Sequence, residues 1–96
     1  MKTYKLQFLP SALKEWRALD NTVREQFKRK LVERLEHPRV ESARLTTMVN
    51  CYKIKLAALG YRMVYRVEDS TVTVEVIAIG KRERGQVYSV ARIRTD

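Results

Sequence analysis

The chain opens with a two-residue hydrophobic period that gives way to helical spacing. Apolar residues alternate with polar ones over residues 3–8, a pattern that predicts a strand: Tyr4, Leu6 and Phe8. Pro10 ends this strand, and Ser11 is the expected N-cap of a helix of about ten residues. Asp20 and Asn21 then break the helical spacing, so a second helix is expected to start after them.

The second helix has the clearer pattern. Its apolar residues recur every four positions: Val23, Phe27, Leu31 and Leu35. Thr22 and Glu25 have the spacing of a capping box, in which each side chain binds a free amide at the start of the helix. Pro38 ends the helix, because the residue before a proline avoids the helical region. The two helices are expected to form a hairpin, with Trp16 and Phe27 in its core.

The second half of the chain is strand-like. Three segments alternate in polarity or are rich in β-branched residues: 51–56, 61–67 and 71–79. Turns are expected at Gly60 and at residues 68–70, and Gly80 is expected to end the last strand. After a basic stretch, residues 86–94 have the spacing of a short helix. Residues 38–50 have little periodicity and are expected to form a loop.

This order of elements predicts an α+β fold. An N-terminal strand precedes a helical hairpin, an antiparallel three-stranded meander and a short C-terminal helix. The hairpin is expected to cover the apolar face of the meander. The length of 96 residues fits a single domain over residues 1–96.

Net charge narrows the class of partner. Twenty Lys and Arg residues against eleven Asp and Glu residues leave a formal charge of +9. A positive field of this strength favours a polyanionic partner, because each phosphate that the protein neutralises releases a counterion. Nucleic acids and acidic proteins both satisfy this condition, so charge alone does not separate them.

Cysteine content and hydropathy limit the compartment and the chemistry. Cys51 is the single cysteine, which excludes an internal disulfide and is typical of a reducing compartment. No apolar run approaches the ~20 residues of a membrane span, and residues 1–5 lack the apolar stretch of a signal peptide. We therefore expect a cytoplasmic protein that contacts no membrane. The absence of Walker, Rossmann and zinc-ligand motifs predicts no metal and no cofactor.

Strand alternation places basic side chains on the sheet face opposite the predicted hairpin. They come from two adjacent strands and from the segment after the last strand: Lys53, Lys55, Arg62, Arg66, Lys81, Arg82 and Arg84. Tyr88 follows this segment, where a tyrosine can stack on a base or pack its ring on the sheet. A basic cluster can hold a phosphate, but a solvated sheet face without a ligand carries the same residue types. The spacing leaves both interpretations open.

Few other residues are candidates for catalysis. His37 is the single histidine, so the histidine pair of many ribonucleases is absent. Its position before Pro38 is typical of a residue that caps a helix end. Glu83 lies between two arginines, where it can act as a general base or pair with its neighbours.

Four blocks of the sequence are characteristic in combination. They are Ala12-Leu13-Lys14-Glu15-Trp16, Cys51-Tyr52-Lys53-Ile54-Lys55-Leu56, Gly60-Tyr61-Arg62 with Val64-Tyr65, and Gly80-Lys81-Arg82-Glu83-Arg84 followed by Val87-Tyr88. Through them the chain resembles, nearly end to end, the RelE family of toxin endoribonucleases from bacterial toxin–antitoxin pairs. The resemblance implies a fold of the microbial ribonuclease type and cleavage of mRNA in the A site of the 70S ribosome, with contacts to 16S rRNA. It also implies inhibition by a RelB-like antitoxin that wraps the toxin, and contact with DNA only through that antitoxin.

The resemblance further implies a set of working residues: Lys53, Lys55, Arg62, Arg82 and Tyr88. In the implied reaction a ribose 2′-hydroxyl attacks the adjacent phosphate, the 5′-oxygen leaves and a 2′,3′-cyclic phosphate forms without a metal. Lys55 is implied as the base and Arg82 as the acid. Lys53 and Arg62 would stabilise the transition state, and Tyr88 would orient the substrate. Three further residues are expected to bind RNA beside them: Lys81, Arg84 and Arg66.

The chain departs from the family pattern at two places. Close relatives usually carry a basic residue and a glycine after Leu45, where this chain has Thr46 and Thr47, and a further basic residue where it has Ala57. These differences remove positive charge near the expected RNA-binding side. Two alternative functions stay open: a basic nucleic-acid-binding module without catalysis, and a toxin of the same superfamily that poisons DNA gyrase.

Overall fold

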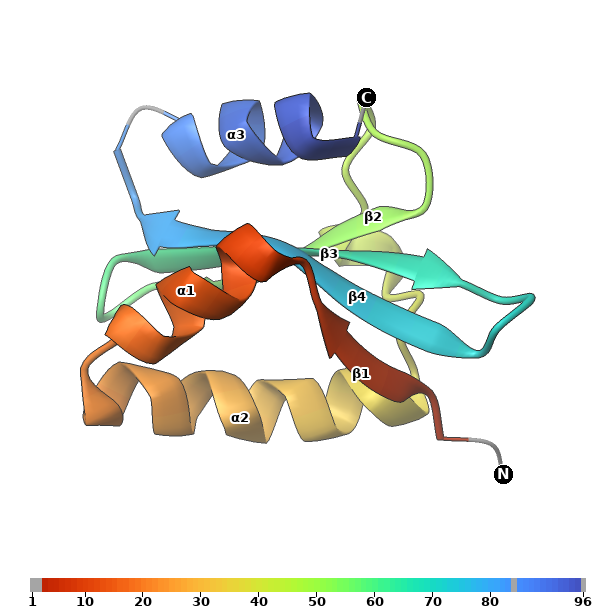
Figure 1. Ribbon diagram of the computed structural model, residues 1–96, viewed down its shortest axis with the longest axis horizontal. Helices are drawn as coiled ribbons and strands as arrows, with labels where there is room; N and C mark the ends of the chain where they lie inside the picture. The colour runs from red at the N-terminus through yellow and green to blue at the C-terminus, as the bar shows by residue number, and fades with distance from the viewer. Residues whose placement is uncertain (1–2, 84, 96) are drawn as a thin grey trace.

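A computed structural model describes residues 3–83 and 85–95 of the chain, and its elements confirm the predicted α+β fold. Figure 1 shows one twisted sheet with α1 and α2 on one side and α3 on the other. The elements in chain order are β1 (Lys5–Phe8), α1 (Pro10–Ala18), α2 (Asn21–Glu36), the short 3₁₀ helix η1 (Glu41–Ala43), β2 (Cys51–Leu56), β3 (Tyr61–Glu68), β4 (Thr73–Lys81) and α3 (Gln86–Thr95).

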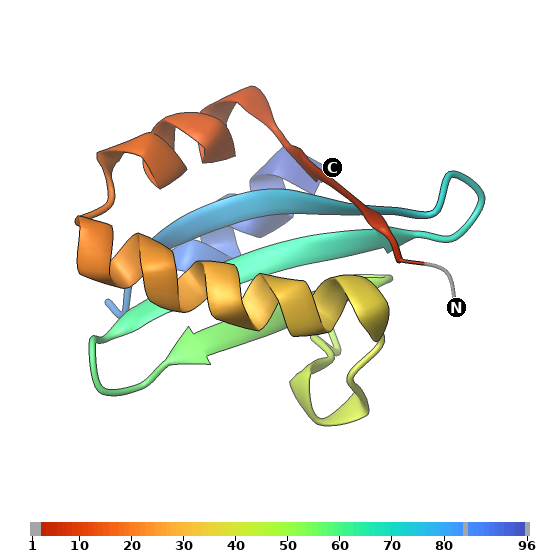
Figure 2. The same ribbon diagram turned by 90° about the horizontal axis from the view of Figure 1, so that it is seen from below.

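The sheet has the strand order β1-β4-β3-β2. The predicted meander is confirmed, because β2 pairs with β3 and β3 with β4, both antiparallel. β1 lies at the opposite edge from β2 and pairs in parallel with β4, from Lys5 opposite Thr73 to Phe8 opposite Val76. Figure 2 shows β1 running beside β4 at this edge. The N-terminal strand thus joins the sheet next to the last strand of the chain.

β4 begins and ends two residues later than the sequence predicts. Thr71 belongs to the preceding turn, in which the Val72 amide donates to the Asp69 carbonyl over 3.2 Å. Gly80 does not end the strand, because the ladder continues to Lys81, which pairs with Tyr61 of β3. The strand therefore extends to the edge of the basic segment.

Both predicted helix caps are wrong. α1 begins at Pro10 with Leu9 at the cap position, and Ser11 already lies inside the helix. Proline suits the first helical position, because its fixed φ is helical and the amide it lacks would have no partner there. The N-cap of α2 is Asp20, whose carboxylate accepts from the Thr22 amide over 3.3 Å, so the proposed capping box starts too late. The end of α2 before Pro38 is as predicted.

The main hydrophobic core lies between the helical hairpin and the sheet. Phe27 of α2 and Ile54, Met63 and Tyr65 of the strands are among its largest fully buried side chains. Trp16 is partly buried and packs on Phe8, with ring centroids 5.3 Å apart. The predicted core positions of the tryptophan and of Phe27 are confirmed.

A second, smaller core lies between α3 and the other face of the sheet. Its buried members are Met48, Cys51, Val64, Ile77, Ala78, Val87 and Ala91. The sequence predicts a solvated face there, with Val64 between two arginines, but α3 folds back over the sheet and buries Val64. A β-bulge contributes: Tyr65 lies opposite Val76 and Val64 opposite Ala78, so Ile77 has no partner in β3. As a result Ile77 and Ala78, although consecutive, both belong to this core.

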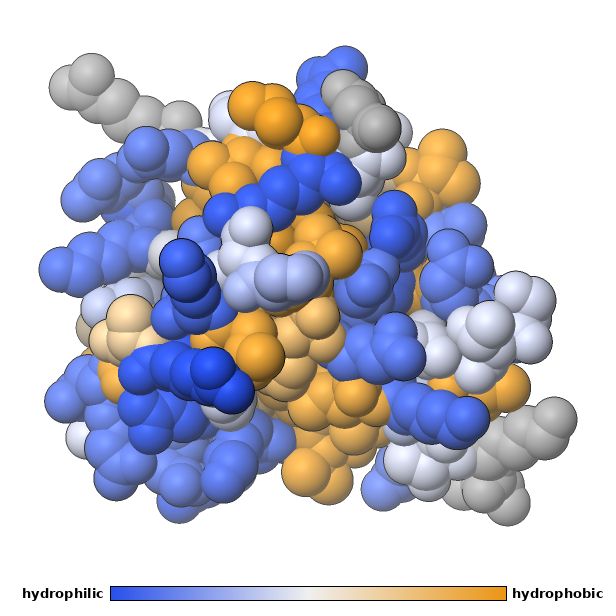
Figure 3. Space-filling view, viewed as in Figure 1, coloured by the Kyte–Doolittle hydropathy of each residue, from blue (hydrophilic) through white to orange (hydrophobic). Residues whose placement is uncertain are grey.

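Polar residues cover much of the outer surface. Figure 3 shows hydrophilic residues on both sides of an apolar band that crosses the face seen in Figure 1. The exposed large apolar residues include Leu6 of β1 and Ile93 of α3. None of the helices in residues 3–83 and 85–95 has the length and apolar character needed to cross a membrane.

The turn between β3 and β4 contains a strained residue and generates a prediction. Val72 has φ 52°, a left-handed conformation that a β-branched side chain adopts at a cost of about 1–3 kcal/mol. Asparagine tolerates this conformation, so Val72→Asn is expected to raise the free energy of unfolding by about 1 kcal/mol. Urea denaturation measures the change. Val72→Thr keeps the β-branch and is the matched control, for which no gain is expected.

Candidate active site

A groove of about 440 Å³ opens on the face of the sheet that α3 partly covers. It is lined by Lys53, Lys55, Arg62, Lys81, Arg82, Glu83, Gly85, Gln86, Val87 and Tyr88. All five residues that the resemblance implies for catalysis are among them, together with one of the three expected to bind RNA. Five cationic side chains against a single carboxylate make this groove, which we call the basic groove, a site for an anion.

The β2–β3 ladder holds three of these cations close together. Lys55 lies directly opposite Arg62 in the antiparallel register, and Lys53 points from the same face two residues earlier in β2. Arg62 is only 8% exposed, and its Nη1 donates to the Tyr61 carbonyl over 3.2 Å. Like charges directly opposite one another destabilise a sheet. An anion bound between these three cations would therefore reduce their repulsion and stabilise the sheet.

The neighbouring positive charges lower the pKa of Lys55. The neighbouring charge of Lys53 lowers the pKa of the Lys55 ammonium, and Arg62, partial desolvation and Arg82 lower it further in that order. A lysine whose pKa is lowered carries more of the neutral amine at a given pH. Only the neutral amine can accept a proton, so Lys55 is suited to act as a base.

Hydrogen bonds outside the groove hold its floor in place. Nη1 of Arg34, on α2, donates to the Lys53 carbonyl over 3.0 Å and to the Tyr65 hydroxyl over 2.9 Å. The Tyr65 hydroxyl in turn donates to the Pro38 carbonyl over 2.6 Å. The backbone of β2 beneath Lys53 is therefore attached to the hairpin on the far side of the sheet.

Arg82 is held at the end of β4 by a backbone contact. Its amide donates to the Gly60 carbonyl over 2.6 Å, across the turn that joins β2 to β3. Gly60 adopts φ +70°, which residues with a side chain rarely adopt, so a glycine belongs at this turn. The turn thus holds in place the basic segment after β4, which lines one end of the groove.

The first turn of α3 forms the opposite wall. The Gln86 amide donates to the Glu83 carbonyl over 2.8 Å, and the Tyr88 amide to the Gly85 carbonyl over 3.1 Å. Tyr88 is partly buried against the second core and also lines the groove, so both interpretations of this tyrosine hold. Gln86, a further wall residue, was not predicted from the sequence, although the glycine just before the start of the helical spacing marks this turn.

Gly80 lets α3 approach the sheet. A Cβ at this position would lie 2.9 Å from Cγ2 of Val87, closer than two carbon atoms tolerate. Gly80 lies opposite Arg62 in the β3–β4 ladder, directly beside the cationic cluster. Because Gly80 has no side chain, α3 can pack close to β4 and form the wall of the groove.

Arg66 does not line the basic groove, and its binding of RNA stays a prediction. It lies four positions after Arg62, roughly 13 Å along a strand. Its guanidinium pairs instead with Glu75 over 2.7 Å and lies 3.8 Å from Glu68. It faces a separate pocket beside Arg92 at the other end of α3. Alternation gave the correct face but not the position along it.

Four other residues considered in the sequence do not line the groove: His37, Thr46, Thr47 and Ala57. Arg84 lies outside the described residues. Thr46 and Thr47 line two other pockets, and Ala57 is exposed in the turn before Gly60. The His37 backbone amide caps α2 by donating to the Glu33 carbonyl over 3.0 Å.

No group of three or more histidine, cysteine, aspartate or glutamate side chains that could hold a metal occurs in the part of the chain that the structure describes. Glu83 lines the groove as its single described carboxylate. Arginine and lysine bind phosphate without a metal, and they dominate this site. The described side chains of the groove are therefore suited to binding a phosphate.

The close approach at Gly80 generates a stability prediction. Gly80→Ala forces its methyl group into Val87 and is expected to lower the free energy of unfolding by about 1–3 kcal/mol, since overpacked sites cannot relax freely. Adding Val87→Ala removes the clashing methyl group. The double variant is therefore expected to lose less than the sum of the two single changes. Urea denaturation of all four proteins measures this coupling, and additive losses would contradict it.

The titration of Lys55 generates a second prediction. Lys53→Gln removes the largest cause of the lowered pKa, so the Lys55 pKa is expected to rise toward its ordinary value. Arg82→Gln removes the smallest cause and is expected to raise it less. Lysine side-chain NMR over a pH series measures both shifts. Lys30→Gln, on the exposed side of α2, is the matched control and should leave Lys55 unchanged.

Comparison with known proteins gives this groove its context. A family model described as the ParE toxin of type II toxin–antitoxin systems matches residues 6–85. The mRNA interferase toxin RelE of Escherichia coli strain K12 is 60% identical over 88 residues, which are 92% of this chain and 93% of that protein. A putative RelE-like toxin protein, also from Escherichia coli, is 45% identical over 91 residues, which are 95% and 96% of the two chains.

Solved structures agree with the sequence relatives. An E. coli RelE mutant with two arginines replaced by alanine, in the free state, has a TM-score of 0.88 at 56% identity, covering 96% of this chain and 97% of that one. RelE in the intact E. coli RelBE toxin–antitoxin complex has a TM-score of 0.82 at 59% identity, covering 84% and 99%. The match in sequence and in fold runs through every strand of the groove. This chain belongs to the RelE family of toxins of type II toxin–antitoxin systems.

Proposed function

We propose that this chain is a ribosome-dependent endoribonuclease that cleaves mRNA in the ribosomal A site and so stops translation. The observation that carries the proposal is the convergence of Lys53, Lys55, Arg62, Arg82 and Tyr88 in one basic groove. The 60% identity to a protein named as an mRNA interferase toxin supports it. Activity on ribosomes implies that the protein works in the cytoplasm.

The scissile phosphate binds where the cations are densest. Lys53, Lys55 and Arg62 come from adjacent positions of β2 and β3, and their mutual repulsion falls when a phosphate neutralises them. Lys81 is the last residue of β4 and also lines the groove, where it contacts a neighbouring phosphate of the RNA. Arg62 is the most buried of these cations and is therefore the most firmly fixed.

Lys55 acts as the general base. In its neutral form the amine takes the proton of the ribose 2′-hydroxyl, and the 2′-oxygen attacks the adjacent phosphorus. The bond from phosphorus to the 5′-oxygen breaks, which leaves a 2′,3′-cyclic phosphate on one product and a 5′-hydroxyl on the other. The lowered pKa of Lys55 supports this role, since it increases the fraction of neutral amine near neutral pH.

The other cations act on the charge that develops during this step. Lys53 and Arg62 face the phosphoryl oxygens and stabilise the pentacoordinate transition state. Arg82 lies beside the leaving 5′-oxygen and acts as the general acid, donating a proton to that oxygen. Tyr88, on the wall formed by α3, stacks on a base and orients the ribose for in-line attack.

Dependence on the ribosome follows from the chemistry of the site. Arginine gives up its proton reluctantly and lysine remains mostly protonated, so proton transfer in this groove is weak compared with that of a histidine pair. Precise positioning of the substrate compensates for weak acid–base groups. The ribosome supplies it by holding the mRNA in a fixed geometry, and the basic surface around the groove contacts 16S rRNA.

An acidic partner is expected to silence the site. RelE of Escherichia coli is found in complex with its antitoxin RelB. The formal charge of +9 on this chain favours a partner of the same kind, a partly disordered acidic segment that folds across the basic groove. Such a segment would exclude RNA by occupying the phosphate-binding cations.

The test is cleavage of an end-labelled mRNA, either free or on ribosomes with an empty A site, in the presence of a chelator. We expect cuts confined to the A-site codon of the ribosome-bound mRNA. Lys55→Ala is expected to lower the rate by about 10²- to 10⁴-fold, the usual contribution of a general base. The rate should rise with pH until Lys55 has lost its proton. Lys53→Gln raises that pKa and should move the rise to higher pH.

Matched controls make the outcome specific. Lys30→Ala changes the same residue type outside the groove and should cleave like the unaltered protein. Intact mRNA on programmed ribosomes, with folded toxin present, would refute the proposal. Inhibition of DNA supercoiling by gyrase would then favour the gyrase-poisoning alternative. Salt-dependent binding that persists in Lys55→Ala and Arg82→Ala, without any cleavage, would favour a binding module.

A further inference from the structure

α3 carries one wall of the basic groove, yet its own anchorage in the sheet is slight. The helix has ten residues, and isolated helices of fewer than about 12–15 residues are barely stable in water. Only Val87 and Ala91 are buried among its described residues, and neither has a large side chain. Ile93, near its C-terminal end, is 75% exposed. Apolar packing alone therefore holds this helix weakly.

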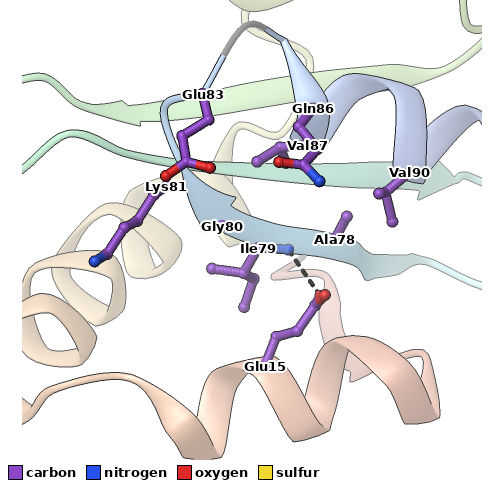
Figure 4. Close-up of a pocket in the computed structure, with 9 residues that line it drawn as sticks. All are labelled: Glu15, Ala78, Ile79, Gly80, Lys81, Glu83, Gln86, Val87 and Val90. Carbon is purple, nitrogen blue, oxygen red and sulfur yellow. Dashed lines mark hydrogen bonds between the residues drawn. The ribbon is translucent and has the colours of Figure 1, made fainter.

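A polar cluster at the end of α3 supplies the missing anchorage. Nη1 of Arg94 donates to the Ile77 carbonyl of β4 over 2.8 Å and to Oε1 of Glu15 over 2.8 Å. Nη2 of Arg94 donates to Oε2 of the same carboxylate over 3.0 Å, so the ion pair is bidentate. Oε1 of Glu15 also accepts from the Ile79 amide over 3.1 Å, as Figure 4 shows. One ion pair thus joins α1, β4 and α3.

The backbone of β4 has groups free for these contacts because of its local geometry. β1 pairs with β4 only as far as Val76, so none of the strands that the structure describes covers the outer edge of β4 beyond that residue. The bulge leaves Ile77 without a partner in β3. Buried backbone groups need a hydrogen-bond partner. Glu15 supplies the acceptor for the Ile79 amide, and Arg94 supplies the donor for the Ile77 carbonyl.

Beside this cluster the flank of α3 is not filled. A cavity of about 190 Å³ lies between Glu15 and the first turns of α3, where Gln86, Val87 and Val90 line it. Figure 4 shows these side chains on one side of the cavity and Glu15 on the other. Without the ion pair, α3 has room to move toward α1. Tyr88 lies on the same short helix and would move with it.

We propose that Glu15 and Arg94 form a latch that fixes α3 to β4 and thereby positions Tyr88 in the basic groove. The proposal rests on the cleavage activity proposed above and adds two positioning residues to it. Neither Glu15 nor Arg94 lines the groove in which the scissile phosphate is proposed to bind. Their effect on cleavage passes through the placement of the helix.

A double-mutant cycle tests the latch. Arg94→Ala is expected to lower kcat on programmed ribosomes by about ten- to a hundredfold, since a misplacement of about 1 Å can cost that much. In a Tyr88→Ala background the same change should have much less effect, because the residue that it positions is already gone. Arg92→Ala, which removes an exposed arginine from the same helix, is the matched control and should cleave normally.

Two further variants separate positioning from folding. Glu15→Gln keeps an acceptor for the Ile79 amide but loses the ion pair, and Arg94→Lys keeps the charge but loses the bidentate contact. Both are expected to fall between the unaltered protein and Arg94→Ala in kcat. Hydrogen exchange should show faster exchange of the α3 amides in all three variants, with the β3 and β4 amides unchanged.

Several results would overturn the latch. Unaltered cleavage by Arg94→Ala would do so, and so would an equal loss in the presence and absence of Tyr88. Global loss of protection in the strands would show a folding defect and not a positioning one. If the unaltered protein itself cuts no mRNA, the proposed function fails, and the mobility of the Tyr88 ring measured by NMR then decides the latch. A ring equally ordered with and without Arg94 would refute it.

Discussion

Repulsion among the cations of the basic groove is the constraint on which the arrangement of the molecule depends. Lys55 lies opposite Arg62, and Lys53 projects beside them from the same face. Like charges placed in this way destabilise the same ladder that holds them together. The ladder withstands this repulsion because its other face is buried under α2, and because Arg34 holds the β2 backbone from below.

The same cations also explain why the sheet is covered unequally on its two faces. α1 and α2 cover one face with large side chains, whereas α3 covers only part of the other. A helix that covered the second face completely would bury Lys53 and Lys55 without a partner, which no packing energy offsets. α3 therefore sits over Val64, Ile77 and Ala78 and leaves the cationic end of the strands open. The groove lies where α3 stops covering the sheet, with the first turn of the helix as its wall.

The sequence predicted most of the fold because hydrophobic period is a local signal. The helical spacing of Phe27 and Leu31 and the alternation of residues 51–56 needed no knowledge of distant contacts. The two caps failed for a local reason as well, since Ser11 and Thr22 have good capping chemistry but Pro10 and Asp20 precede them and start the helices earlier. The backbone geometry is needed to decide which of several neighbouring residues is the N-cap of a helix.

Features that depend on several segments meeting in space were out of reach of the sequence. Alternation assigned Arg66 to the correct face, but its distance from the groove depends on strand length, and its pairing with Glu75 depends on the β3–β4 register. The second core could not be predicted from Val64, because nothing in β3 indicates that α3 returns over it. The family resemblance named the five groove residues, whereas Gly80 and the contact of Glu15 with Arg94 became visible only in the structure.

The parallel pairing of β1 with β4 has a consequence for the order in which the protein folds. The first strand to leave the ribosome has its partner near the other end of the chain, with Lys5 opposite Thr73. Contacts this remote in sequence form late, because the intervening loop must close before they stabilise anything. The wall of the groove comes later still, since Tyr88 lies beyond β4. A chain in which α3 has not yet packed on the sheet therefore lacks one wall of the groove, so the complete groove is a late product of folding.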